Sequence, residues 1–175
     1  RSSDLLSFQF FINCPPESRD VQTIYQKLST TNNQGISAFI TSSNSSRAII
    51  KFIASSGSSV MSASYDFPKN QFIHLATVFD REASGLSSLK IYKTGSLVAT
   101  SSNTVSFGTI DFSSNTLVIG SGSSQSLGLL DAGSFVPKVT LSASIDDFRC
   151  YHGGRTSKAI KSDYLKNKYY LIYSN

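Results

Sequence analysis

The chain has 175 residues, a length that fits one domain and suffices to bury a core without a metal ion or a disulfide. Charged residues make up only 15%, and the 12 Phe, 8 Tyr, 35 Ser and 12 Thr disfavour both a disordered chain and a helical protein. The net charge of +5 comes entirely from residues 149–175, because positive and negative side chains balance over residues 1–148, and no apolar run is long enough to cross a membrane.

Short apolar or alternating runs follow one another along the chain, separated by clusters of Ser, Asn and Gly. This pattern is typical of an all-β protein, and eleven runs at this spacing require two stacked sheets. The expected strands are Leu5–Asn13, Ile24–Leu28, Ile36–Thr41, Ala48–Ala54, Val60–Tyr65, Phe72–Phe79, Leu89–Tyr92, Leu97–Thr100, Thr116–Gly120, Val136–Leu141 and Ser144–Tyr151. We therefore predict an all-β, two-sheet antiparallel sandwich. We expect residues 1–175 to form a single domain that belongs to a larger protein.

The clearest turn in the sequence is Lys93-Thr94-Gly95-Ser96, which lies between two of these runs. Glycine adopts the positive φ that a tight hairpin requires. The runs on either side of it should therefore pair as neighbouring strands.

Residues Gly120–Gly133 form one long irregular stretch, and it carries Leu127, Leu129 and Leu130. Loops of this length are usually functional or disordered, and three leucines indicate that this loop packs on something. Two interpretations stay open. The loop folds back over the edge of its own sheet, which is the commoner case, or it binds a partner.

A helix is predicted at the end of the chain, capped by Thr156 or Ser157 and reaching about Tyr170. Its apolar face should hold Ile160, Tyr164 and Leu165. The rest of its surface is expected to be mostly unpaired positive charge, with Asp163 as the one acidic residue. The cations that we consider as binding residues are Arg155, Lys158, Lys161, Lys166 and Lys168.

Six segments carry a family resemblance in their order and spacing. They read LLSFQFFIN, IYQKL followed by GISAFI, QFIHLATVFD, LKIYKTGSLVATSS, TLVIGSG and ASIDDFRCYHGGRTSKAI. Together they resemble the concanavalin A-like lectin and laminin-G-like jelly-roll superfamily. The resemblance implies a jelly-roll sandwich with one C-terminal helix, in which Phe8, Phe10 and Ile12 of the first strand lie against Phe148 of the last. Further residues expected against this sheet are Leu75, Val78, Ile91, Val118 and Ile119.

This sequence lacks the catalytic residues of the glucanases that share the superfamily it resembles. Retaining glucanases of this fold resemble one another in an E-x-D-x-E strand, because two carboxylates must flank the sugar bond about 5 Å apart. No such strand occurs, since Glu17 and Glu82 are the only glutamates and the adjacent Asp146 and Asp147 point to opposite faces of a strand. In the resembling family this aspartate pair is structural. We therefore predict a protein that is not an enzyme.

The two histidines do not suggest a base or a metal site either. His74 lies in an apolar run and is expected to be a hydrogen-bonded, half-buried side chain, because no strained nucleophile turn accompanies it. Neither a spaced His/Cys motif nor a D-x-D loop is present, so we expect no zinc, no calcium and no other cofactor.

The cysteines bear on the compartment. Cys14 ends the first expected strand and Cys150 ends the last, and the resemblance makes these strands antiparallel neighbours. The two thiols should then lie roughly 20 Å apart, which is beyond the reach of a disulfide. Free thiols suit a reducing compartment. We expect a cytoplasmic protein, with peripheral membrane association as one option and an extracellular location as the alternative.

Three function classes follow, of which the third, a glycosidase-like enzyme, lacks its carboxylates. The chain is similar to the concanavalin A-like domain of BEACH-family trafficking scaffolds, which implies a non-catalytic module of a large cytosolic scaffold. Its basic helix and leucine loop would dock neighbouring domains or an acidic protein. The alternative is an extracellular or viral lectin in which Tyr65, Phe67 and Tyr151 stack on sugar rings. Nucleic acid is not an expected partner, because the lysine helix lacks interleaved aromatic residues and groove-reading motifs.

Overall fold

The computed structural model describes residues 5–18, 20–42, 44–81, 87–103, 107–108, 110–112, 115–128 and 133–173. The strands are β1 (Leu6–Asn13), β2 (Gln22–Ser29), β3 (Gln34–Ser42), β4 (Arg47–Ser56), β5 (Ser59–Pro68), β6 (Ile73–Arg81), β7 (Ser87–Lys93), β8 (Ser96–Asn103), β9 (Val118–Ile119), β10 (Gln125–Gly128), β11 (Gly133–Phe135) and β12 (Ser144–His152). One helix, α1 (Ser157–Tyr173), follows the last strand.

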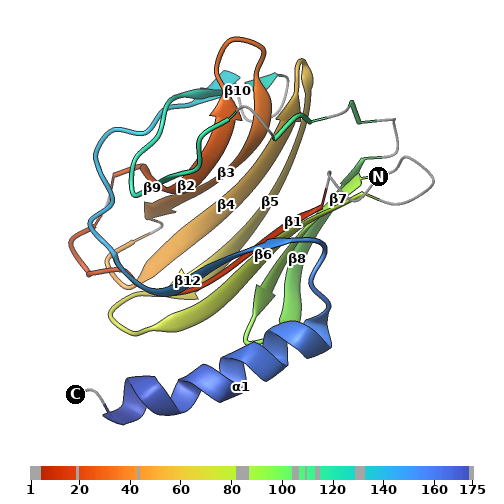
Figure 1. Ribbon diagram of the computed structural model, residues 1–175. Helices are drawn as coiled ribbons and strands as arrows, with labels where there is room; N and C mark the ends of the chain where they lie inside the picture. Colours follow the sequence, from red (N-terminus) through yellow and green to blue (C-terminus); the bar gives the residue numbers. More distant parts are fainter. Residues whose placement is uncertain are drawn as a thin grey trace.

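Two five-stranded antiparallel sheets face each other, and they confirm the predicted all-β sandwich (Figure 1). Sheet A has the strand order β12-β1-β6-β7-β8, and sheet B has the order β5-β4-β3-β2-β9. The first strand and the last strand are neighbours, with Phe8 opposite Cys150 and Asn13 opposite Ser144. This closure of the chain ends within one sheet is the connection expected of the jelly roll.

The core between the sheets is rich in aromatic rings. Phe8 stacks on Tyr25 with ring centroids 4.1 Å apart, and Phe148 lies 5.9 Å from Phe8 and 5.8 Å from Phe10. The expected packing of the first strand against Phe148 is therefore confirmed. The hydroxyl oxygens of Tyr25 in sheet B and Thr77 in sheet A are 2.5 Å apart, so a buried hydrogen bond joins the two sheets.

The hairpin between β7 and β8 also agrees with the prediction. Thr94 and Gly95 both have positive φ, at 49° and 85°, which is the conformation of the two-residue turn that matches the twist of paired strands. The two strands pair from Lys93 opposite Ser96 outward.

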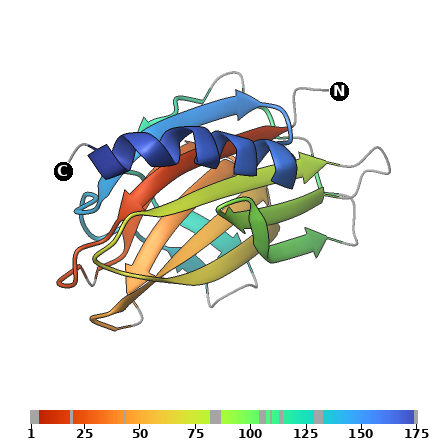
Figure 2. The same cartoon turned by 90° about the horizontal axis from the view of Figure 1, so that it is seen from below.

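Helix α1 lies along the outer face of sheet A (Figure 2). Its first turn is capped as expected, because Thr156 Oγ1 accepts a hydrogen bond from the Ala159 amide at 3.3 Å. Ile160 is fully buried on the sheet, whereas Leu165, which we expected on the same face, is 47% exposed. No helix in the described part of the chain combines the length and the apolar character that crossing a membrane requires.

Several expected core contacts are wrong. Val78 is buried, but it packs under α1 with Ala76, Tyr92 and Ile160, because it points to the outer face of sheet A. Val118 and Ile119 are exposed, since they form the short edge strand β9. The expected strand Val136–Leu141 is reduced to a single parallel bridge between Gln22 and Val139.

Candidate functional site

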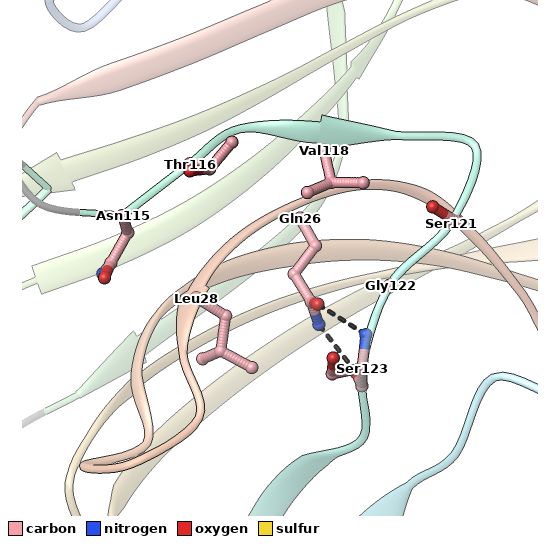
Figure 3. Close-up of a pocket in the computed structure, with 8 residues that line it drawn as sticks. All are labelled: Gln26, Leu28, Asn115, Thr116, Val118, Ser121, Gly122 and Ser123. Atoms are coloured by element: carbon pink, nitrogen blue, oxygen red, sulfur yellow. Dashed lines mark hydrogen bonds between the residues drawn. The ribbon is translucent and has the colours of Figure 1, made fainter.

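A pocket of about 430 Å³ opens at the edge of sheet B, between β2 and the segment that carries β9 (Figure 3). Its lining is contributed by two stretches of chain that are distant in sequence. The lining residues are Gln26, Leu28, Asn115, Thr116, Val118, Ser121, Gly122 and Ser123.

Gln26 fixes one wall of the pocket. Its Nε2 donates to the Ser123 carbonyl at 2.9 Å and to Ser37 Oγ at 3.1 Å, while its Oε1 accepts from the Ser123 amide at 2.7 Å. Both dashed bonds to Ser123 are visible in Figure 3. Gly122 passes so close to β2 that an added Cβ would lie 2.8 Å from Thr23 Oγ1. The wall is therefore held in place before any ligand arrives.

The opposite wall is fixed through Asn115. Its side-chain Nδ2 donates to the backbone carbonyls of Gln34 and Asp111 at 3.4 and 3.3 Å, and its backbone carbonyl accepts a hydrogen bond from Lys27 Nζ. Between the two walls, the Gly120 amide donates to the Ile24 carbonyl at 2.9 Å. These bonds attach the whole segment from Asn115 to Ser123 to β2 and β3.

The pocket offers hydroxyl, amide and backbone groups together with two apolar side chains, Leu28 and Val118. None of the eight lining residues has an ionisable side chain, so the pocket itself supplies no general acid, base or nucleophile of ordinary strength. Such a surface suits an uncharged ligand that carries many hydroxyl groups and one apolar face. It does not favour a carboxylate or a phosphate, which are usually bound by Arg or Lys.

Sequence reasoning did not identify this pocket. Gln26 and Ser123 are 97 positions apart, and no local motif connects them. The only signal was the irregular stretch Gly120–Gly133, whose first four residues after Gly120 include three of those that line the pocket.

The cations that we predicted as binding residues divide into two groups. Lys158, Lys161 and Lys166 are exposed on α1. Arg155, in contrast, is engaged: its guanidinium pairs with Asp163 and lies over the Tyr151 ring at 4.3 Å. The side chain of Lys168 lies outside the described residues.

Asp163 is the centre of a polar cluster between α1 and sheet A. Burial alone would raise the pKa of its carboxyl, but hydrogen bonds from Arg155, Tyr151 and Gln9 and the Arg155 charge outweigh that effect and hold the pKa below its usual value. The only acidic residue of the helix therefore faces inward and is ionised.

In the stretch Gly120–Gly133, which we call the leucine loop, the one leucine that the structure describes is not exposed as a docking residue would be. Leu127 is 2% exposed, because it packs on Phe39 and Ile53 on the outer face of sheet B. Strands β10 and β11 form a small hairpin over that face, and Gln125 donates to Ser55 Oγ at 2.7 Å. Leu129 and Leu130 lie outside the described residues. The covering role is thus the one observed for Leu127.

Two further expectations about single residues need correction. His74 is 4% exposed rather than half-buried, and its Nδ1 has no hydrogen-bond partner. Phe67 is completely buried in the core, so it cannot stack on a sugar. The expectation of free thiols is confirmed, with Cys14 buried and Cys150 exposed.

Acidic side chains form no catalytic pair among those described. Asp147 pairs with the Arg149 side chain at 2.7 Å, and Asp146 Oδ1 accepts from the Asp147 amide at 2.8 Å, so both carboxylates are engaged locally within β12. Glu82 lies outside the described residues, and Glu17 is exposed. Within the described ranges, no three His, Cys, Asp or Glu side chains gather as a metal site would require.

Comparison with known proteins agrees with this architecture. The family model for the concanavalin A-like lectin/glucanases superfamily matches residues 2–161. No significant match was found among curated protein sequences.

Several solved structures are similar to this chain. HCR/D-Sa-GBL1/C has a TM-score of 0.61 at 16% identity, and the binding domain of botulinum neurotoxin DC in complex with SialylT has a TM-score of 0.57 at 17% identity. In both comparisons 94% of this chain is covered, but only 36% of the other chain. The CBM40 domain of the Ruminococcus gnavus IT-sialidase has a TM-score of 0.53 at 9% identity, with 92% of this chain and 83% of that chain covered.

Proposed function

The chain belongs to the concanavalin A-like lectin/glucanases superfamily, and from this premise we propose that it is a non-catalytic binding domain for uncharged glycans. The observation that carries the proposal is the composition of the pocket beside β2. Its side chains donate and accept hydrogen bonds without carrying charge, and Leu28 and Val118 provide an apolar contact. A sugar presents the matching combination of hydroxyl groups and a C–H face.

The rigidity of the pocket supports this ligand class. Sugars are strongly hydrated, so a binding site gains most when its own polar groups are fixed in advance and need little ordering. Gln26 and Asn115 provide this fixation through hydrogen bonds to Ser123, Gln34 and Asp111. The toxin binding domain in complex with SialylT and the sialidase CBM40 domain are only 17% and 9% identical to this chain, so they support the fold alone. The proposed ligand class rests on the composition of the pocket.

The lack of lining charge makes the proposal specific. A sialylated ligand carries a carboxylate, which is usually recognised by Arg or Lys. Neither Arg nor Lys occurs among the eight described residues that line the pocket. The domain should therefore prefer neutral oligosaccharides to their sialylated or sulfated counterparts.

Docking to a protein, which the sequence suggested, stays a prediction. Two of the residues predicted to dock a protein make contacts within the domain instead, because Leu127 is buried and Arg155 pairs with Asp163. Placement in a BEACH-family scaffold in the cytoplasm also stays a prediction, and the sequence that flanks the domain in its parent protein would test it.

A glycan array tests the proposed function. The variant Ser121→Trp places a large side chain at the pocket and should reduce binding of the best neutral glycan by about tenfold or more. Ser64→Trp is the matched control, since Ser64 is an exposed hydroxyl on β5, at the opposite edge of the same sheet. Equal loss of binding in both variants, or binding restricted to charged glycans, would contradict the proposal.

A further inference from the structure

Helix α1 presents two contrasting faces. Ile160 and Tyr164 face sheet A, where Ile160 is completely buried and the Tyr164 ring lies 5.4 Å from that of His74. Lys158 and Leu165, seven residues apart, lie on the opposite face, and Lys161 lies at its margin, where it rests on Gly95 of the β7–β8 turn but is still exposed. All three are exposed, so the outward face combines positive charge with an apolar side chain.

Two more large apolar side chains are exposed near the helix. Phe72 is 43% exposed and immediately precedes β6, two residues before His74, whose ring contacts Tyr164 of α1. Leu97 is 53% exposed and pairs with Tyr92, whose ring packs under α1. Together with Leu165, at 47% exposed, they give this side three apolar projections.

The hairpin between β7 and β8 brings these groups to one end of the molecule. The Thr94 amide donates to the His74 carbonyl at 3.1 Å, which places the hairpin beside the start of β6. Gly95 lies directly beneath Lys161, and its carbonyl accepts from Ser157 Oγ. The first turn of α1, the β7–β8 turn next to Leu97 and the start of β6 next to Phe72 are thus neighbours. We refer to Phe72, Leu97, Lys158, Lys161, Leu165 and Lys166 as the basic-apolar surface.

Positive charge dominates on this side of the helix. Asp163, the one acidic residue of α1, faces inward and is paired with Arg155. The net positive charge of the chain comes from residues 149–175. The helix therefore attracts an anionic partner through its outward lysines.

The shape of the basic-apolar surface distinguishes between anionic partners. Helix α1 is the outermost layer on the sheet A side of the molecule (Figures 1 and 2), and its residues Lys158, Lys161, Leu165 and Lys166 are exposed. A protein partner would need a complementary groove to bury such separate projections. A lipid bilayer receives them without one, since apolar side chains enter the headgroup region while lysines contact anionic lipids.

We propose that the basic-apolar surface docks the domain on an anionic phospholipid membrane. Lys158, Lys161 and Lys166 contact the headgroups, and Phe72, Leu97 and Leu165 enter the interface. The glycan pocket lies at the edge of sheet B, away from this surface, so the proposal does not depend on the proposed function.

Vesicle co-sedimentation of the full 175-residue chain tests the proposal. One set of vesicles contains phosphatidylcholine alone, and the other contains about 30% phosphatidylserine as the anionic lipid. We expect binding only to the anionic vesicles, with loss of binding as salt is raised, because the attraction is screened. The variant K158E/K161E/K166E should weaken binding by about a hundredfold or more, since each lysine contributes separately.

Two controls complete the design. Lys138→Glu changes an exposed lysine at the edge of sheet B and should weaken vesicle binding by less than about fivefold. Leu165→Ser removes an apolar projection without changing charge, and it should weaken binding by about tenfold. All variants should keep the melting temperature of the parent chain, because these side chains are exposed.

Three results would overturn the proposal. The first is equal binding to both kinds of vesicle. The second is an equal effect of K138E and of the triple variant, which would indicate general charge attraction. The third is failure to bind anionic vesicles together with retention on immobilised poly-glutamate, which would assign the surface to an acidic protein.

Discussion

Lys161 of α1 lies directly on Gly95 of the β7–β8 turn. A Cβ added to Gly95 would come within 2.8 Å of Lys161 Cα and 2.9 Å of its amide nitrogen. This contact, together with the hydrogen bond from Ser157 Oγ to the Gly95 carbonyl, fixes the start of α1 on sheet A. The position of the basic-apolar surface therefore depends on the absence of a side chain at residue 95.

Substitution of Gly95 tests this contact. Gly95→Ala should lower the free energy of unfolding by about 2–4 kcal/mol, since it combines positive φ with a backbone clash. Gly57→Ala is the control, because Gly57 has φ 64° but open space around its Cβ position. It should cost only about 1 kcal/mol. Urea denaturation measures both values, and equal costs would show that α1 does not rest on Gly95.

His74 should make stability depend on pH. Burial lowers the pKa of its imidazole from 6.5 to about 4, an effect that Asp147 and Asp163 partly oppose and Arg149 adds to. The unfolded chain then binds a proton more readily than the folded one, so the free energy of unfolding falls as pH drops from about 6.5 to about 4. The loss is of the order of 3 kcal/mol.

His74→Phe isolates this effect. Its ring should fill the space between Phe11 and Tyr164, whose centroids lie 4.9 and 5.4 Å from that of His74, and no hydrogen bond to Nδ1 is lost. The difference in unfolding free energy between parent and variant should change over this pH range. A difference that is independent of pH would show that His74 does not titrate as described.

The hydrogen bond between Tyr25 and Thr77 should behave as a pair. Tyr25→Phe leaves the buried Thr77 hydroxyl without its partner and should cost about 1–2 kcal/mol of unfolding free energy. Adding Thr77→Val removes the orphaned hydroxyl, so the double variant should recover part of that loss. If the double variant instead loses the sum of both single effects, the hydroxyl pair makes no net contribution.

The cysteines should differ in reactivity. Burial raises the pKa of Cys14 to about 12, although Lys69 opposes the shift, and burial also raises the pKa of the more accessible Cys150. Alkylation of the folded chain at mildly alkaline pH should therefore modify Cys150 alone, because only an accessible thiolate reacts. Mass spectrometry should show both cysteines modified after unfolding without reductant. No modification there would reveal a disulfide.

The positions of the strands, the turn and the helix were predicted from the sequence more accurately than the direction in which individual side chains point. The pairing of β1 with β12 and the contact of Phe8 and Phe10 with Phe148 follow from the order of apolar runs and the family resemblance. Val78 was assigned to the wrong face, because β6 is apolar on both sides, facing the core on one and α1 on the other. A continuous apolar run contains no information about direction.

The candidate pocket could not be predicted for a different reason. It exists because the amide of Gln26 binds both backbone groups of Ser123, and such a contact depends on how the chain returns to β2. The burial of Leu127 likewise required the position of β10 over Phe39 and Ile53. Of the candidate binding residues, only the exposure of Lys158, Lys161 and Lys166 could be predicted, because helical spacing indicates the face that each residue occupies.

The central claim, that the pocket beside β2 binds uncharged glycans, is tested most directly by mapping the bound ligand on the domain. Backbone amide signals in nuclear magnetic resonance spectra would be followed while the best neutral oligosaccharide from the array is added. We predict shifts concentrated at Thr116 and Ser121 to Ser123 in the segment that carries β9 and at Gln26 and Leu28 in β2. Shifts confined to α1, or an absence of shifts with any neutral oligosaccharide, would contradict the claim.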